Sequence, residues 1–267
     1  MTKRKAAPHR LFAFAFVAGV AIAGGVTLGP GVARPAMAEP ATLAVAPVPA
    51  DAPFASEINA FAKADQKQMP PTGAVLFIGS SSIRLWDTLA KDFPEIPVIN
   101  RGFGGSLVAQ STLYADRIAI PYKPKIIVMY AGTNDLDNGT RTPEQVLQDY
   151  KDFVAKVHAA LPDTRIVYLS VNPSVLRWKQ EAHILEANHL IEEFTLATNS
   201  KTEKLNFINS HSPLLSPEGL PQPNLLRADG LHLNADGYQV WASIVKPRIL
   251  ALAALDGVER LDAPKAK

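Results

Sequence analysis

Short apolar runs rich in β-branched residues alternate along most of this chain with longer stretches of helical periodicity. Five runs are candidate strands, at residues 74–79, 97–102, 125–132, 165–171 and 205–209. The stretches around them predict helices near residues 83–92, 106–119, 143–160, 180–199 and 235–254. Continuous apolar strands separated by helices are typical of a parallel sheet covered on both faces. The pattern therefore predicts a three-layer α/β domain with right-handed crossovers.

The first 38 residues have the layout of a secretory signal peptide. Basic residues come first, at Lys3, Arg4, Lys5 and Arg10. An apolar run over residues 11–28 follows, and residues 36–38 form an AxA cleavage pattern. This order predicts removal of residues 1–38 and export to a periplasm or to the outside of the cell. A retained membrane anchor is the alternative, because an apolar run of about 18 residues is near the lower limit for spanning a bilayer.

The composition after residue 38 narrows the classes of partner. The chain has 27 Lys and Arg against 25 Asp and Glu, and residues 1–38 hold five of the basic residues and none of the acidic ones. With 22 basic residues left, the exported protein has a net charge near −3. It has no clustered basic face, so nucleic-acid binding is not indicated. Cysteine is absent, which excludes disulfides, thiolate metal sites and cysteine nucleophiles.

Composition also suggests where the folded domain begins and ends. Residues 39–54 are rich in Ala and Pro and lack a sustained period, which predicts a linker. We expect the folded domain over residues 55–256 and a C-terminal tail over residues 257–267. After cleavage of the signal, no stable membrane span is expected.

Four polar segments follow predicted strands or precede the last predicted helix. They are Gly79-Ser80-Ser81-Ser82 after the first strand, residues 100–106 (NRGFGGS) after the second, Gly132-Thr133-Asn134-Asp135 after the third, and Asp229-Gly230-Leu231-His232 near the C-terminus. In an open parallel sheet, ligands bind outside the carboxyl ends of the strands. The four segments could therefore converge on one side of the sheet.

Each segment alone has an ordinary explanation. A serine turn before a helix is usually a cap, a glycine turn supplies positive φ, and an Asp and a His three residues apart can be a surface pair. Together they hold every part of an acyl-transfer site. Serine supplies a nucleophile, histidine a base and aspartate a group that orients the imidazole, while a glycine N–H and an asparagine amide can face an oxyanion.

In their order and in their residues, the four segments resemble the signature blocks of the SGNH, or GDSL-like, hydrolase family over roughly residues 73–250. The resemblance implies a flavodoxin-like fold with a five-stranded parallel sheet. It makes Ser81 the nucleophile and Asp229 and His232 the rest of a triad. It assigns the oxyanion hole to Gly105, Asn134 and the N–H of Ser81. The wording around GTND and DGLH is similar to the platelet-activating-factor acetylhydrolase branch, whose substrates carry short acyl groups.

Two positions depart from the family pattern. Ser80 replaces the aspartate that gives the GDSL name, and Ser106 replaces an aspartate common after the oxyanion glycine. Because the first aspartate is not a triad member, its loss should change how the turn is supported and leave the chemistry. Three consecutive serines make Ser82 the second choice for the nucleophile, with helix capping as the ordinary role for Ser80 and Ser82.

Residues outside the four segments are less decisive. Arg177 and Trp178, after the fourth predicted strand, either line a substrate pocket or belong to a packed loop, and Trp86 is expected to pack against the core. The remaining histidines of the domain lie in predicted helices or a loop and suit the role of base less well: His158, His183, His189 and His211. Neither HExxH nor another clustered ligand spacing is present, so we expect no catalytic metal and no cofactor.

The sequence as a whole predicts an exported serine esterase that hydrolyses short-chain acyl esters of small molecules or carbohydrates, including carbohydrate O-acetyl groups. Three alternatives stay open: an acyltransferase with the same triad, a noncatalytic carbohydrate-binding relative, and a flavodoxin-like cofactor binder. A noncatalytic relative should have lost a triad residue, and a cofactor binder gives no reason for GTND and DGLH. The oligomeric state does not follow from the sequence.

Overall fold

The computed structural model describes residues 46–261, apart from the side chains of residue 138 and residues 200–202. The predicted signal peptide and its cleavage position lie outside the described residues. None of the described helices is long and apolar enough to cross a membrane.

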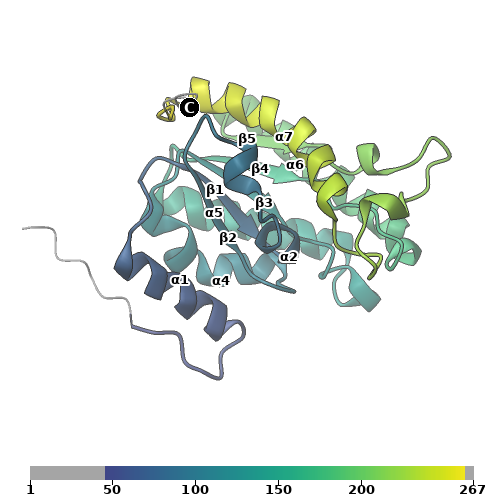
Figure 1. The fold of residues 1–267 in the computed structure, drawn as a ribbon, viewed down its shortest axis with the longest axis horizontal. Helices are drawn as coiled ribbons and strands as arrows, with labels where there is room; N and C mark the ends of the chain where they lie inside the picture. Colours follow the sequence, from purple (N-terminus) through teal and green to yellow (C-terminus); the bar gives the residue numbers. More distant parts are fainter. Residues whose placement is uncertain (1–45, 262–267) are drawn as a thin grey trace, which may run out of the picture. The chain divides into compact units, whose positions relative to one another are not determined.

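Five parallel strands form a single sheet in the order β2-β1-β3-β4-β5 (Figure 1). They are β1 (Val75–Gly79), β2 (Val98–Gly102), β3 (Ile126–Tyr130), β4 (Arg165–Leu169) and β5 (Leu205–Ile208). All five lie within the predicted runs, so the predicted flavodoxin-like three-layer α/β fold is confirmed. The order reverses between β1 and β3, because the chain passes from β1 to β2 on one side and returns to β3 on the other. In such sheets this switch point opens a crevice at the carboxyl ends of the strands.

Helices cover both faces of the sheet. One face is covered by α1 (Ala55–Lys67), α4 (Val108–Ile118), α5 (Pro143–Ala160) and α6 (Glu181–Thr202), and the other by α2 (Ser81–Arg84), α3 (Leu89–Asp92) and α7 (Ala235–Leu255). Short 3₁₀ turns complete the chain: η1 (Ile120–Tyr122), η2 (Asp137–Gly139), η3 (Trp178–Gln180), η4 (Ser212–Leu214) and η5 (Pro223–Leu225).

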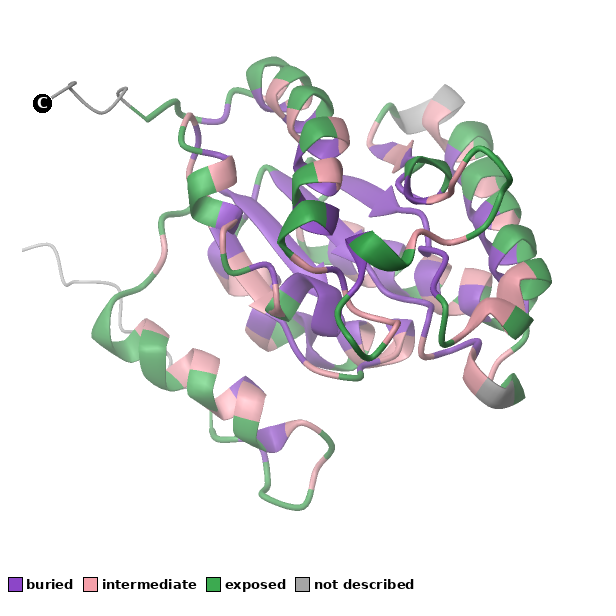
Figure 2. Ribbon diagram, turned by 45° about the vertical axis from the view of Figure 1, so that its right-hand side comes forward, coloured by how far each residue is buried: buried purple, intermediate pink, exposed green. Residues whose placement is uncertain are grey.

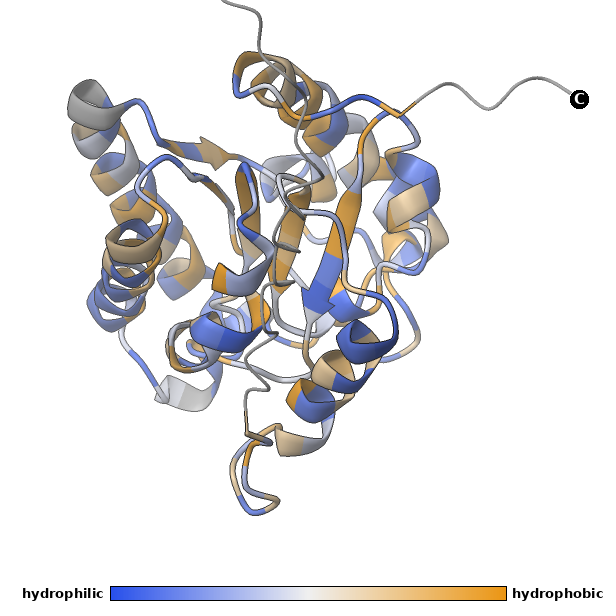
Figure 3. Cartoon of the chain, turned by 90° about the vertical axis from the view of Figure 1, so that its left-hand side faces the viewer, coloured by the Kyte–Doolittle hydropathy of each residue, from blue (hydrophilic) through white to orange (hydrophobic). Residues whose placement is uncertain are grey.

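Side-chain alternation along the strands separates the two cores. In β1, Leu76 and Ile78 join the core under α4 and α5, whereas Val75 and Phe77 join the core under α7. Successive strand residues point to opposite faces, so an apolar strand must be covered on both sides. The central strands β1, β3 and β4 are buried, and Figures 2 and 3 show a largely buried and hydrophobic sheet, with the polar residues of the edge strand β2 as an exception.

Local signals explain why α5 occupies the predicted residues 143–160. Thr142 accepts a hydrogen bond from the N–H of Gln145, and the Gln145 side chain accepts one from the N–H of Thr142 at 2.9 Å. This is a capping box, and Pro143 occupies the first helical position, where its missing N–H costs nothing.

Two predicted segments differ in the structure. The expected helix near residues 83–92 is two short helices, α2 and α3, because the indole of Trp86 turns inward between them and its Nε1 donates to Asp92 at 2.6 Å. Residues 46–54, expected to be a linker, pack against the domain. Val48 is buried, and both its backbone groups hydrogen-bond to the side chain of Asn59 in α1, a helix that was not predicted.

Candidate active site

The serine-rich turn follows β1 at the switch point. Gly79 ends the strand at φ 131°, and a Cβ there would lie 1.9 Å from the carbonyl oxygen of Tyr130. Glycine is therefore required for the turn. The chain then enters α2 with Ser81 as its first residue, where helix geometry leaves the Ser81 N–H without an intrahelical partner.

Three residues far apart in the sequence form one hydrogen-bonded chain. His232 Nε2 lies 2.9 Å from Ser81 Oγ, and His232 Nδ1 lies 2.7 Å from Asp229 Oδ2. The other oxygen of Asp229 accepts from the backbone N–H groups of Leu231 and His232, at 2.9 and 3.0 Å. The structure therefore brings the predicted serine, histidine and aspartate together.

The ionisation state of Asp229 determines which ring nitrogen of His232 carries a hydrogen. Burial raises the pKa of this carboxyl, but hydrogen bonds from the His232 side chain and from the backbone outweigh it and lower the pKa to about 2. An ionised carboxylate can only accept a hydrogen bond, so Nδ1 of His232 carries a hydrogen. Nε2 of a neutral imidazole is then free to accept the proton of Ser81.

The two flanking serines have different surroundings from Ser81. Ser80 is the N-cap residue of α2 but makes no side-chain cap hydrogen bond, and its buried Oγ has no partner. Ser82 is buried next to the same cleft, and its carbonyl accepts from Tyr238 Oη at 2.8 Å. Ser81 is thus the member of the trio whose hydroxyl meets the imidazole, and the capping expected of Ser80 is absent.

The two remaining predicted oxyanion groups lie in the loops after β2 and β3, and Asn134 lines the cleft at Ser81 whereas Gly105 does not. Gly105 has a φ of 73° and is exposed, and its N–H has no acceptor among the described residues. The neighbouring N–H of Gly104 is already used, because it donates to Glu57 Oε1 at 2.8 Å. Asn134 lines the cleft and its Nδ2 donates to the carbonyl of Ser106 at 3.1 Å, which joins the loops after β2 and β3.

Asp135 connects the loops after β2 and β3 from the protein interior. It is fully buried, and its Oδ1 accepts from the N–H of Val108, the first residue of α4, at 3.0 Å. Its Oδ2 has no partner. Burial raises the pKa of Asp135 to about 6, and the hydrogen bond from Val108 only partly opposes this.

Arg177 and Trp178 do not line the cleft at Ser81. Arg177 lies behind Asn134, with Nη1 donating to the carbonyl of Thr133 and to Asn134 Oδ1, both at 2.9 Å. Trp178 begins η3 and is partly exposed. Of the two roles expected for these side chains, lining the pocket at Ser81 differs from their observed positions, and membership of a loop packed beside it remains.

The cleft is small and mostly polar. Its empty volume is about 270 Å³, including the part open to solvent. Beside residues of the four segments, it is lined by groups that the motifs did not indicate: Tyr130, Asn172, Pro173 and Ser174. Asn172, Pro173 and Ser174 come from the loop after β4 that also carries Arg177 and Trp178.

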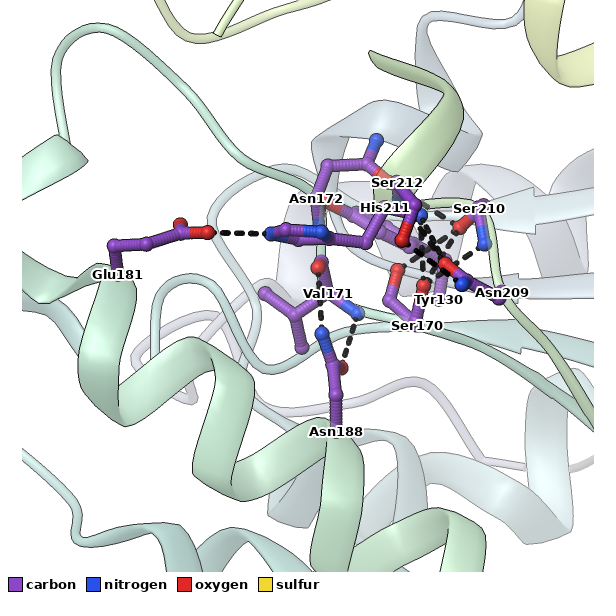
Figure 4. A network of polar contacts seen from close by, with 10 residues as sticks. All are labelled: Tyr130, Ser170, Val171, Asn172, Glu181, Asn188, Asn209, Ser210, His211 and Ser212. Carbon is purple, nitrogen blue, oxygen red and sulfur yellow. Dashed lines mark hydrogen bonds and ion pairs between the residues drawn. The ribbon is translucent and has the colours of Figure 1, made fainter. Parts of the chain in front are cut away.

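A buried polar network supports Asn172 (Figure 4). Asn172 Oδ1 accepts from Ser210 Oγ at 3.2 Å and from Trp241 Nε1 at 3.3 Å. Farther from the cleft, His211 Nε2 lies 2.8 Å from Glu181 Oε1. Because an indole N–H can only donate, the carboxamide oxygen must face Trp241, and the amide nitrogen is left for the cleft.

The remaining predicted residues have ordinary environments. Trp86 is buried and stacks on Tyr238, as expected for a core residue. Of the other histidines, His158 contacts the carbonyl of Thr164 at 2.9 Å and His189 lies 3.4 Å from Glu193. Within residues 46–261, as far as they are described, no group of three or more His, Asp or Glu residues is placed to hold a metal ion.

Comparison with known proteins agrees with this arrangement. Residues 79–240, more than half of the chain, match the GDSL-like Lipase/Acylhydrolase family, and all four polar segments lie within the match. Human platelet-activating factor acetylhydrolase IB subunit alpha2 is 24% identical over 177 residues, which are 65% of this chain and 73% of the relative.

Solved structures share the fold at low sequence identity. A GDSL-like lipase from Bacteroides thetaiotaomicron aligns with a TM-score of 0.59 and 20% identity, covering 73% of this chain and 97% of that structure. A carbohydrate esterase family 3 structure from Talaromyces cellulolyticus gives a TM-score of 0.55 and 17% identity, covering 67% and 96%.

Proposed function

Because the chain belongs to the GDSL-like lipase/acylhydrolase family, it is a hydrolase, and we propose that it is an exported serine esterase for short-chain acyl esters. Carbohydrate O-acetyl groups are the first substrate class to test. The observation that carries the proposal is the hydrogen-bonded chain from Asp229 through His232 to Ser81, which is the arrangement that nucleophilic acyl transfer requires.

In the proposed mechanism, Ser81 Oγ attacks the ester carbonyl carbon while His232 Nε2 takes its proton. The carbonyl π electrons move to the oxygen, and the oxyanion accepts hydrogen bonds from Gly105 N–H, Asn134 Nδ2 and Ser81 N–H. His232 returns the proton to the departing alcohol, leaving an acyl group on Ser81. Water then attacks this acyl enzyme while His232 takes its proton, the bond between the acyl carbon and Ser81 Oγ breaks, His232 returns the proton to Ser81 Oγ, and the carboxylic acid leaves. These steps use no cofactor.

The size of the cleft supports a short acyl group. Its empty volume of about 270 Å³ includes the part open to solvent, so the enclosed space beside Ser81 is smaller still. Two similar proteins point the same way by name, an acetylhydrolase and a carbohydrate esterase.

A series of chromogenic esters with acyl chains from two to twelve carbons tests the proposal. We expect kcat/KM to be highest for the shortest chains and to be lost in Ser81→Ala. Hydrolysis in the Ser81→Ala variant equal to that of the wild type would overturn the serine mechanism, and a maximum at long chains would overturn the short-chain assignment. Adding an alcohol acceptor and analysing the products separates hydrolysis from acyl transfer.

We also propose that export ends with cleavage after Ala38. The basic residues, the apolar run and the AxA pattern occur in the order that a signal peptidase substrate requires. N-terminal sequencing of the exported protein should begin at Glu39. A mature chain that still carries residues 11–28 would support a membrane anchor instead.

A further inference from the structure

We propose that Arg177 is a positioning residue that orients the carboxamide of Asn134 so that its nitrogen faces the oxyanion. This inference rests on the proposed esterase function and deepens it by assigning a group behind the oxyanion hole.

The contacts of Arg177 fix one end of the Asn134 side chain. Arg177 Nη1 lies 2.9 Å from Asn134 Oδ1, and also 2.9 Å from the carbonyl and 3.2 Å from the hydroxyl of Thr133. A guanidinium has donors only, so the group of Asn134 that faces it must be the amide oxygen. The flipped carboxamide would place its NH₂ group against the N–H donors of Arg177, so Nη1 would lose one of its acceptors and the NH₂ group would face no acceptor there.

The other end of the carboxamide is fixed as well. Asn134 Nδ2 donates to the carbonyl of Ser106 at 3.1 Å, and that carbonyl belongs to the loop that carries Gly105. An amide nitrogen has two hydrogens, so one remains for the cleft that Asn134 lines. Because Arg177 removes the freedom of the carboxamide to turn, the second hydrogen is aimed before substrate arrives. Donors that need no reorganisation are the effective ones in an oxyanion hole.

Arg177 is itself held in place. Its side chain is only 12% exposed and its Nη2 lies 3.1 Å from Asp137 Oδ2. Its backbone N–H donates to Ser174 Oγ at 3.2 Å. On the preceding residue, the N–H of Leu176 donates to the carbonyl of Gly230, next to Asp229, at 2.9 Å. The loop after β4 thus ties the asparagine loop to the loop of the histidine.

A direct role in substrate binding fits these contacts less well. Arg177 is absent from the lining of the cleft, and its Nε is buried without a partner. Its donors on Nη1 already point at the loop after β3. Removing Arg177 should therefore change how well Asn134 stabilises the transition state and should change substrate binding little.

A double-mutant cycle on the full chain tests this, with a short-chain chromogenic ester as substrate. We expect Asn134→Ala to lower kcat by about 10²-fold to 10³-fold, the usual loss for one oxyanion donor. Arg177→Ala should lower kcat by roughly 10-fold or more with KM changed less than about 3-fold, because the interaction is made in the transition state. In the Asn134→Ala background, Arg177→Ala should cause almost no further loss, since coupled residues are not additive.

Two controls make the cycle decisive. Arg141→Ala removes an arginine that pairs with Asp149 at 3.5 Å and touches neither Asn134 nor the cleft, so its kcat should match the wild type. Arg177→Lys keeps the charge without the fork of donors, and it should recover only part of the activity.

The outcomes separate this inference from the function on which it rests. Equal loss from Arg177→Ala in both backgrounds, a rise in KM alone, or unchanged kcat would overturn the positioning role. If instead Ser81→Ala keeps full hydrolysis, the proposed function fails. Melting temperatures of all variants above the assay temperature exclude unfolding as the cause of a lost kcat.

Discussion

Two pairs, each of an acidic and a basic side chain, lie at opposite edges of the sheet. One is near the amino ends of the strands and the other is near their carboxyl ends. Arg165, the first residue of β4, forms a bidentate pair with Asp256 after α7, at 2.6 and 2.9 Å. These side chains are 6% and 9% exposed. His232 and Asp229, near the carboxyl ends of the strands, are closer to solvent at 22% and 45%.

The difference lies in what each pair leaves free. The remaining donor group of Arg165 donates to Asn206 Oδ1 and to the carbonyl of Glu203, so the protein itself supplies the acceptors for this guanidinium. The pair of His232 and Asp229 leaves Nε2 facing Ser81 beside an open cleft. The same kind of contact between an acidic and a basic side chain can therefore stabilise a fold or take part in a proposed reaction. The proposed catalytic pair differs from the structural pair in its greater exposure and in having a ring nitrogen that faces the nucleophile.

The largest expected effect is the loss of ester hydrolysis when His232, in the exposed pair with Asp229, is replaced. His232→Ala should lower kcat/KM by about 10⁴-fold or more, because removing a triad base removes most of the acceleration by the nucleophile. Its free energy of unfolding should stay within about 1 kcal/mol of the wild type, since the side chain is partly solvated. Ester hydrolysis and urea unfolding measure the two. His189→Ala, on an exposed face of α6, is the matched control with unchanged activity. A folded His232→Ala variant with normal turnover would remove this residue from the site.

The buried pair should respond in the opposite way. Asp256→Ala leaves the Arg165 guanidinium buried without its carboxylate, which should lower the free energy of unfolding by about 3 to 5 kcal/mol. At a temperature where the variant is folded, kcat should be that of the wild type. Asp229→Ala is the counterpart, with lost turnover and a smaller loss of stability, because this carboxylate is partly solvated but accepts backbone hydrogen bonds. Equal effects of the two substitutions on turnover would remove the distinction between the pairs.

A smaller effect is expected at Asp135, which is buried like Asp256 but lacks a cation in hydrogen-bond contact. Its pKa is raised to about 6 in the folded protein, so between about pH 4 and pH 6 the folded state binds the proton more tightly than the unfolded state. Stability from this group is therefore present at low pH and is lost as pH rises through about 6, by roughly 2 to 3 kcal/mol.

Asp135→Asn removes this titration and tests its sign. The difference in unfolding free energy between wild type and variant should shift in favour of the variant as the pH rises from 4 to 7. Urea unfolding at each pH gives the curve. A constant difference over this range would mean that Asp135 has an ordinary pKa in the folded protein.

Much of the fold was predictable because short, mostly apolar runs alternate with stretches of helical periodicity, a pattern typical of a parallel sheet covered on both faces. Helix α1 was missed, since its residues follow an Ala- and Pro-rich stretch without a break that marks a start. The helix expected near residues 83–92 was wrong in its middle, where burial of Trp86 overrides helical propensity.

For the candidate site, the local sequence motifs indicated the residues that we propose carry the chemistry but not those that support them. The contact between Arg177 and Asn134 joins positions 43 residues apart, and no spacing in the sequence predicts it. The same is true of Glu57 in α1, which occupies the N–H of Gly104 and leaves that of Gly105 free. Such contacts depend on how loops from different strands meet.

The central claim is that Ser81 is the nucleophile of the exposed site, and covalent labelling tests it most directly. A fluorophosphonate should label the wild type at one peptide, with mass spectrometry placing the adduct on Ser81. Ser81→Ala should lose both labelling and hydrolysis, by about 10³-fold or more, while Ser80→Ala and Ser82→Ala keep both. An adduct on Ser82, together with an active Ser81→Ala variant, would contradict the account.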